Sequence, residues 1–230
     1  MIIMKKIYFT LIALLASINM LAQGWPANYS GVMLQGFSWD SYDYSQWTVL
    51  EKQADDMKGF IDLVWLPQSG KCIETTQVMG YKPYYYFNQN SSFGTEAELR
   101  SLIAKFKANG IGAIADVVVN HRNTNGWYTF PAETYKGVTY QMLSTDICKN
   151  DDGGSTATQA KKDGVSLSQN NDEGTDFGAC RDIDHKSENV QKIIKAYLKF
   201  LKEDIGYTGF RYDMVKGFSG SHVADYNDAT

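Results

Sequence analysis

The fold of this 230-residue chain is decided by the stretch IGAIADVVVNH, residues 111–121. Its apolar, β-branched centre predicts a buried strand over residues 114–119. The strand stops at two polar residues, Asn120 and His121. Polar residues at the carboxyl end of a buried parallel strand are placed where α/β folds bind their ligands.

Similar apolar runs and helix-period segments alternate on both sides of this stretch. Helix caps support the reading, because Thr95 and Glu98 form a capping box and Gly110 stands at the matching carboxyl end. The βα alternation predicts a parallel α/β fold. The further predicted strands cover residues 32–37, 61–66 and 209–213, and the predicted helices cover residues 45–59, 95–110 and 187–206.

Composition excludes several classes of protein. Hydrophobic residues make up 43% and charged residues 21%, which excludes a wholly disordered chain. The net charge is −4 and no basic cluster is present, so we expect no nucleic-acid partner. Aromatic residues reach 13%, a supply that suits stacking on flat polar ligands as well as core packing. A neutral substrate or a cation fits the negative net charge best.

The amino terminus predicts export. Lys5 and Lys6 precede the apolar run 7–16, and the small residues near 21–23 suit a cleavage site. We therefore expect residues 1–22 to be a signal peptide and the protein to be secreted or periplasmic. The apolar run is too short and interrupted for a membrane anchor, so no membrane span is expected in the mature chain.

The three cysteines, Cys72, Cys148 and Cys180, are too few for a disulfide framework and too widely spaced for a zinc site. An exported protein could pair two of them, and the sequence leaves the pairing open.

Two charged residues share one face of the fourth predicted strand. Arg211 and Asp213 are two positions apart, so their side chains point to the same side. The cation favours the ionised carboxylate, which can then act as a nucleophile. A purely structural ion pair is the alternative for this pair taken alone.

Five motifs in order strengthen the catalytic interpretation. They are QGFSWD at 35–40, GYKP at 80–83, DVVVNH at 116–121, RDIDH at 181–185 and GFRYDMVKG at 209–217. Together they resemble the catalytic barrel of the alpha-amylase superfamily of glycoside hydrolases, with the nearest resemblance to plant-type and related bacterial alpha-amylases. The resemblance covers residues 29–230 and implies a (β/α)8 TIM barrel.

The resemblance also implies a division of the chain. After the signal peptide, residues 23–121 hold the first part of the barrel, with its first three strands. Residues 122–185 form an inserted calcium-binding subdomain after the third strand. Residues 186–230 continue the barrel with the third helix and fourth strand, so the barrel is truncated after about four βα units.

The resemblance assigns roles to matching residues. Asp213 matches the nucleophile, Arg211 the arginine that orients it, and His121 the histidine that hydrogen-bonds the sugar at the cleavage point. Substrate contacts are implied at Trp39, Tyr81 and Lys216.

The same resemblance implies bound Ca²⁺, which takes hard oxygen ligands. A solvated, Asp-rich linker and hydrogen-bonded strand-end caps are the alternatives. The matching side-chain ligands are Asn120, Asp172 and Asp182, with the carbonyls of Thr175 and Gly217. A second, plant-type calcium is implied at Asp152 and Asp176.

The implied activity is calcium-dependent, retaining hydrolysis of alpha-1,4 bonds in starch-like glucans or malto-oligosaccharides, by a protein that is monomeric at full length. Retaining glycosidases need a second carboxylate. In the family this is a Glu after the fifth strand, which the chain lacks, and Asp184 and His185 are no substitute. We therefore expect an amino-terminal fragment that is inactive alone.

Two other functions stay open at this point. One is a different activity of the superfamily, such as an oligosaccharide-specific hydrolase, a debranching enzyme or a glucanotransferase. The other is a non-catalytic glucan-binding protein, although pure binding does not require a nucleophile. The sequence does not decide between endo and exo action.

Overall fold

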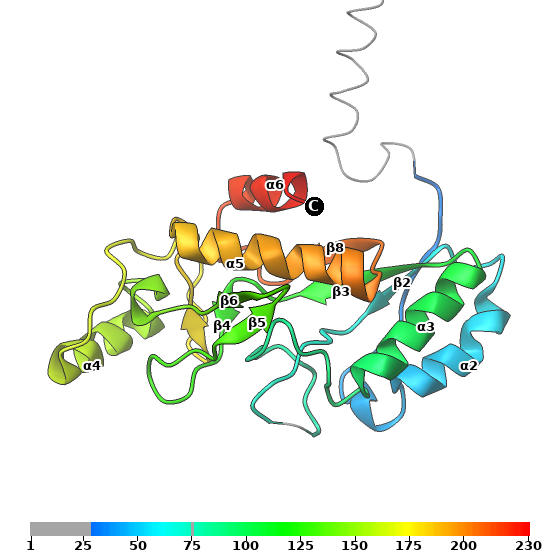
Figure 1. Cartoon of the computed structure of the whole chain (residues 1–230), viewed down its shortest axis with the longest axis horizontal. Helices are drawn as coiled ribbons and strands as arrows, with labels where there is room; N and C mark the ends of the chain where they lie inside the picture. Colours follow the sequence, from blue (N-terminus) through cyan, green and yellow to red (C-terminus); the bar gives the residue numbers. More distant parts are fainter. Residues whose placement is uncertain (1–28, 75) are drawn as a thin grey trace, which may run out of the picture. The chain divides into compact units, whose positions relative to one another are not determined.

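A four-stranded parallel sheet forms the centre of the structure, a computed structural model that describes residues 29–74 and 76–230. The fold below is that of residues 32–230. The strands follow the chain order β1-β2-β3-β8, and every neighbouring pair is parallel. This confirms the predicted α/β sheet. Figure 1 labels β2, β3 and β8 of this sheet. The strands are β1 (Met33–Gln35), β2 (Leu63–Leu66), β3 (Gly112–Val117) and β8 (Gly209–Tyr212).

The predicted strands differ from the observed ones mainly at their ends. β3 begins two residues earlier than expected and stops at Val117, and Val118 and Val119 are buried beyond it. β1 is only three residues long and exposed, since β2 is its sole neighbour among the described strands. The pairing of β3 with β8 places Asp116 opposite Arg211. That register brings the charged residues of two strands together.

Helices α2 (Trp47–Met57) and α3 (Glu96–Ala108) pack against each other beside the sheet (Figure 1). The predicted capping box of α3 is confirmed: Thr95 and Glu98 exchange side-chain to backbone hydrogen bonds. Leu99, Leu102 and Phe106 of α3 are buried, as their spacing predicts.

The carboxyl-terminal helices depart from the expected pattern. One helix was expected over residues 187–206, but α5 (Glu188–Lys199) is followed by a π-helical segment, η4 (Phe200–Ile205). The wider turn buries Phe200, Leu201 and Ile205 together. Helix α6 (Gly220–Asp228), which the sequence pattern did not predict, packs against α5.

The connection between β3 and α5 forms small elements of its own. It contains two short antiparallel pairs, one short helix and two 3-10 turns. These are β4 (His121–Arg122) with β7 (Arg181–Asp182), β5 (Glu133–Tyr135) with β6 (Val138–Tyr140), α4 (Ser155–Asp163), η2 (Ser144–Asp146) and η3 (Asp152–Gly154).

Three other expectations concern the amino terminus, membrane spans and the cysteines. The predicted signal peptide, residues 1–22, lies outside the described residues. Within the described part, no helix is long and apolar enough to cross a membrane. The three cysteines are all buried and free, so none of them forms a disulfide in this structure.

A buried ion pair ties this connection to the loop after β2. The Arg122 and Glu133 side chains are 2.7 Å apart and almost wholly buried. Glu133 also accepts hydrogen bonds from the backbone N–H groups of Tyr86 and Phe87. Arg122 donates to the Tyr84 carbonyl, and its guanidinium lies 4.2 Å from the centre of the Tyr86 ring. Each charge is thus compensated by several partners, as burial requires.

Replacing one partner tests this pairing. Arg122→Met leaves the Glu133 carboxylate buried without its cation and should lower the free energy of unfolding by about 3–5 kcal/mol. Adding Glu133→Gln removes the buried charge and should restore part of that loss. Urea unfolding of the two variants measures both effects. Equal stability of Arg122→Met and the unaltered protein would contradict the assignment.

Candidate active site and metal site

Arg211 joins two carboxylates at the carboxyl end of the sheet. Its Nη1 lies 2.5 Å from Asp213 Oδ1 and 3.0 Å from Asp116 Oδ1. Asp116 is buried, whereas Asp213 and Arg211 are half-buried. One guanidinium therefore orients the Asp213 carboxylate at the edge of the site and anchors itself to Asp116 beneath.

Asp116 is held from two further sides. Its Oδ2 accepts hydrogen bonds from the Tyr81 hydroxyl at 3.0 Å and from Trp65 Nε1 at 3.3 Å. The Arg211 guanidinium lies 4.8 Å from the centre of the Trp65 ring. Burial raises the pKa of Asp116 to about 6, and the Arg211 cation opposes the rise. Because all of its oxygens are engaged and shielded, Asp116 is a structural anchor.

Two stacked aromatic rings lie beside this charged group. The Trp39 and Tyr81 rings are nearly parallel, at an interplanar angle of 5° and 6.2 Å between centres. Trp39 is 70% exposed, so its ring is available to a ligand. Both rings line a cleft of about 320 Å³, together with Asp40, Met79 and Lys82. Two of the residues predicted to bind substrate thus lie in one cleft, and the Tyr81 hydroxyl connects it to the Asp116–Arg211–Asp213 group.

His121 is buried and both of its ring nitrogens are engaged. Nε2 lies 2.9 Å from the Tyr81 carbonyl oxygen, and Nδ1 lies 3.3 Å from Asn120 Nδ2. The ring is stacked on Phe177, at 3.8 Å between centres. Burial lowers the pKa of His121, which favours the neutral imidazole. In this arrangement His121 positions the backbone of Tyr81.

Asn120 stands at the centre of the predicted metal site. Its Nδ2 donates to Asp182 Oδ1 at 3.0 Å, but its buried Oδ1 has no hydrogen-bond partner. Gly217 packs so tightly on this oxygen that a Cβ atom there would overlap it. Asp172 has a second unpartnered buried oxygen, Oδ2. Buried oxygens without donors, beside a carboxylate, fit the ligand set of a hard cation such as Ca²⁺.

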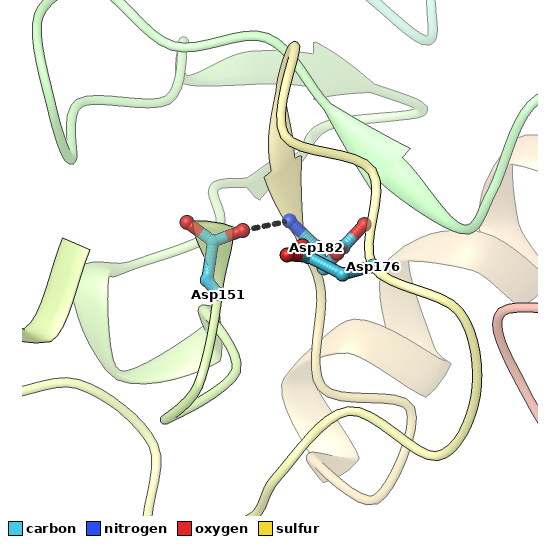
Figure 2. A group of neighbouring side chains, drawn as sticks. All are labelled: Asp151, Asp176 and Asp182. Atoms are coloured by element: carbon cyan, nitrogen blue, oxygen red, sulfur yellow. Dashed lines mark hydrogen bonds between the residues drawn. The ribbon is translucent and has the colours of Figure 1, made fainter. Parts of the chain in front are cut away.

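Asp176 and Asp182 belong to a group of three aspartates, each of which offers a carboxylate oxygen within 4.8 Å of the others (Figure 2). Burial raises the pKa of Asp182 to about 8, and its hydrogen bond with Asp176 adds to the rise. Burial also raises the pKa of Asp176, but hydrogen bonds from Asp182 and the Gly153 and Asp152 amides outweigh it and leave that pKa below its usual value. A cation bound beside the pair would favour the ionised form of both carboxylates.

Asp151 completes this acidic group but is already paired. The sequence reading missed it. The Asp182 amide donates to its Oδ1, as the dashed line in Figure 2 marks. Its Oδ2 accepts from Thr156 Oγ1 at 2.6 Å and lies 2.7 Å from Arg181 Nη1. Arg181 balances the charge of Asp151, and both carboxylate oxygens have partners. Asp151 therefore holds β7 in place.

The other predicted residues lie around this group. The Thr175 amide donates to the Lys216 carbonyl at 3.0 Å, which joins the loop 172–177 to the loop after β8. The Asp152 amide donates to Asp176 Oδ1 at 3.1 Å. The Lys216 side chain is exposed. The structure thus gathers the predicted ligands into one region beside the carboxyl ends of β3 and β8.

Asp116 is the main residue of this charged group that is absent from the predicted set. It belongs to the DVVVNH motif, and a signal for it existed. A lone carboxylate within an apolar strand requires a buried partner, and Arg211 on the next strand supplies it.

Comparisons with known proteins relate the chain to one family. A family model described as the alpha amylase catalytic domain matches residues 60–229. Alpha-amylase 3, chloroplastic, of Arabidopsis thaliana is 33% identical over 207 residues, covering 86% of this chain and 21% of the relative. Probable alpha-amylase 2 of the same plant is 28% identical and covers 85% and 44%. The chain spans less than half the length of these relatives.

Solved structures share the fold. An alpha-amylase I mutant from Eisenia fetida, in complex with maltohexaose, aligns with a TM-score of 0.61 and 17% identity, covering 86% of this chain and 40% of that one. The alpha-amylase of Malbranchea cinnamomea aligns with a TM-score of 0.58 and 20% identity, covering 86% and 43%.

The contact between Gly217 and Asn120 gives a direct prediction. Gly217→Ala should displace Asn120 or the loop after β8 and lower the free energy of unfolding by about 1–3 kcal/mol. Gly220→Ala is the matched control, since a Cβ atom there meets nothing within 4 Å. Thermal unfolding compares the two variants. Equal melting temperatures would show that the close contact is absent.

Proposed function

The chain belongs to the alpha-amylase catalytic-domain family, and we propose that it carries the nucleophile of a retaining glycoside hydrolase acting on alpha-1,4-glucans. One observation carries the proposal. The Asp213 carboxylate is held by Arg211 beside an aromatic-lined cleft, while the Arg211 charge is anchored to buried Asp116. A purely structural ion pair would not require this three-membered arrangement at a cleft.

In the proposed reaction, Asp213 attacks the anomeric carbon of the bound sugar. The carbon–oxygen bond to the leaving sugar breaks as the ester to Asp213 forms, and a second carboxyl group protonates the leaving oxygen. That group, as carboxylate, then activates water, which hydrolyses the ester and frees Asp213. Arg211, whose Nη1 lies 2.5 Å from Asp213 Oδ1, orients the carboxylate for the attack.

Asp116 cannot be the second carboxyl group, the acid/base of the proposed reaction. Asp116 is only 1% exposed and its oxygens are bound by Arg211, Tyr81 and Trp65, so it cannot reach a sugar. We assign the acid/base role to a residue outside 29–230. A further part of the barrel would also cover β1, whose Met33 and Leu34 are exposed.

The cleft suits a neutral, polyhydroxylated substrate. Trp39 and Tyr81 present aromatic faces, and Lys82 and Asp40 offer polar groups. An alpha-amylase of the same fold binds maltohexaose. His121 orients Tyr81 in the proposed site and would reach the sugar by exchanging its bond to the Tyr81 carbonyl, whereas exposed Lys216 would contact the leaving-group side.

We assign a structural Ca²⁺ to the oxygens of Asn120, Asp172 and Asp182. The carbonyls of Thr175 and Gly217 complete the proposed set, and Asp152 and Asp176 would serve a second ion. The unpartnered oxygens of Asn120 and Asp172 support the first assignment. When bound, the cation supplies positive charge that neutralises the carboxylates and cross-links residues 122–185, the proposed inserted subdomain, to the barrel strands.

Export completes the proposal. It rests on the charged and apolar pattern of residues 1–22, which would be removed as a signal peptide. The mature protein would then act on glucans in the periplasm or the medium.

Removing the nucleophile tests the reaction. The chain is expressed with any coding sequence that follows residue 230, and reducing-sugar release from starch is measured. Asp213→Asn should lower kcat/KM at least about a thousandfold, because the amide cannot form the ester. Asp228→Asn, on the exposed end of α6, should leave it unchanged. Full activity of Asp213→Asn would refute the nucleophile, and starch hydrolysis by residues 23–230 alone would refute the assignment of the acid/base role to a residue outside them.

Removing a ligand tests the metal site. Ca²⁺ at about a hundred times its Kd should stabilise the protein by about 2.7 kcal/mol and raise its melting temperature. Asp182→Asn should abolish both the stabilisation and the binding heat measured by calorimetry. Asp225→Asn, an exposed change on α6, is the matched control. An unaltered calcium response in Asp182→Asn would exclude that residue as a ligand.

A further inference from the structure

Trp65 reaches the charged group from β2, a strand that the proposed mechanism does not use. It is paired with Ile114 of β3, and Asp116 lies two residues further along β3. Residues that are opposite one another, or two apart on one strand, share a face of the sheet, so Trp65 points to the same side as Asp116 and Arg211. With strands about 4.8 Å apart, a side chain from β2 spans about 10 Å to reach Arg211 on β8. The indole is long enough to do so across β3.

The indole makes two contacts with the charged group. Its Nε1 donates a hydrogen bond to Asp116 Oδ2 at 3.3 Å, and its ring centre lies 4.8 Å from the Arg211 guanidinium. Phe37 holds the indole in turn, because its ring meets that of Trp65 edge to face, at 5.0 Å between centres. Trp65 is neutral, so it contacts a cation and a carboxylate without altering the charge balance of the group.

Arg211 gains a second restraint from this ring. Its hydrogen bonds to Asp116 and Asp213 all use one nitrogen, Nη1. A guanidinium held through one nitrogen can pivot about that atom, and a tilt would move the Asp213 carboxylate with it. An aromatic ring against the guanidinium opposes the tilt, because the attraction between a cation and a ring depends on their mutual position. A reacting group misplaced by about 1 Å can lose about a hundredfold in rate.

We propose that Trp65 is a positioning residue of the reaction, which fixes the Arg211 guanidinium and through it the Asp213 carboxylate. The inference rests on the proposed function. Trp65 is not among the described residues that line the cleft with Trp39 and Tyr81. Replacing it should therefore slow the formation and the hydrolysis of the ester and leave the affinity for the glucan unchanged.

The division of the effect between kcat and KM tests this role. Both constants are measured on starch, with the protein expressed together with any coding sequence that follows residue 230. Trp65→Phe keeps a smaller ring but loses the N–H donor, and should lower kcat about tenfold. Trp65→Leu loses both contacts and should lower kcat about a hundredfold. KM should change less than about twofold in either variant.

Trp127→Phe is the matched control. The Arg181 guanidinium lies 5.0 Å from the centre of the Trp127 ring, so this variant also alters a contact between a tryptophan and an arginine. Trp127 belongs to the connection between β3 and α5 and not to the charged group at Arg211. The variant should change neither kcat nor KM.

An activated substrate separates the nucleophile from the acid/base. In a maltosyl fluoride the carbon–fluorine bond breaks as the ester to Asp213 forms, and the departing fluoride ion needs no proton. A misplaced nucleophile slows this reaction as well, so Trp65→Phe should lower kcat for fluoride release about tenfold too. A defect on starch that disappears with the fluoride overturns the positioning role.

The other outcomes separate this role from the proposed function. Unchanged kcat in Trp65→Leu, or a loss that appears only as a higher KM, overturns the positioning role and leaves the nucleophile standing. Full hydrolysis by Asp213→Asn overturns both together. If thermal unfolding shows that the Trp65 variants are not folded, Phe37→Leu, which removes the ring that holds the indole, replaces them. It should lower kcat about threefold at unchanged KM, and no effect there overturns the positioning role.

Discussion

The contact of Arg211 with Asp116 and Asp213 is the interaction on which the site depends. It exists because β3 and β8 are adjacent and because their register places Asp116 opposite Arg211. A shift of one residue in that register would turn Arg211 to the other face of the sheet. Asp116 balances the cation from the buried side, whereas Asp213 is half-buried at the edge of the site, where the proposed reaction takes place. The different roles proposed for the two carboxylates rest on this difference in burial.

The connection after β3 is fastened to this site at several points. Asn120 bonds Asp182, Thr175 bonds the Lys216 carbonyl, and Gly217 packs on Asn120. The loop that carries the proposed metal ligands is therefore hydrogen-bonded to the loop that follows Asp213. In the proposed enzyme, a cation at Asn120 would stabilise the geometry of the nucleophile without touching the substrate. On the other side, Arg122 and Glu133 support the loop that carries Tyr84 and Tyr85.

The sequence predicted the sheet, its strand order and the clustering of most candidate residues, because apolar runs with polar ends have few alternative placements. It did not predict contacts between distant segments. The engagement of both His121 nitrogens depends on the Tyr81 carbonyl, and the neutralisation of Asp151 depends on Arg181. The π-helical segment after α5 was also missed, since it satisfies the same apolar spacing as a regular helix.

The central claim is that Asp213 forms the covalent bond to the sugar. The protein is expressed with any coding sequence that follows residue 230 and is then incubated with a fluorinated glucosyl fluoride. The fluorine slows hydrolysis of the glycosyl-enzyme ester, so the ester accumulates. Peptide mass spectrometry then locates the added sugar. The account predicts a single modified peptide with the sugar ester-linked to Asp213. A sugar attached to another carboxylate, or none attached while the enzyme still turns over starch, would contradict it.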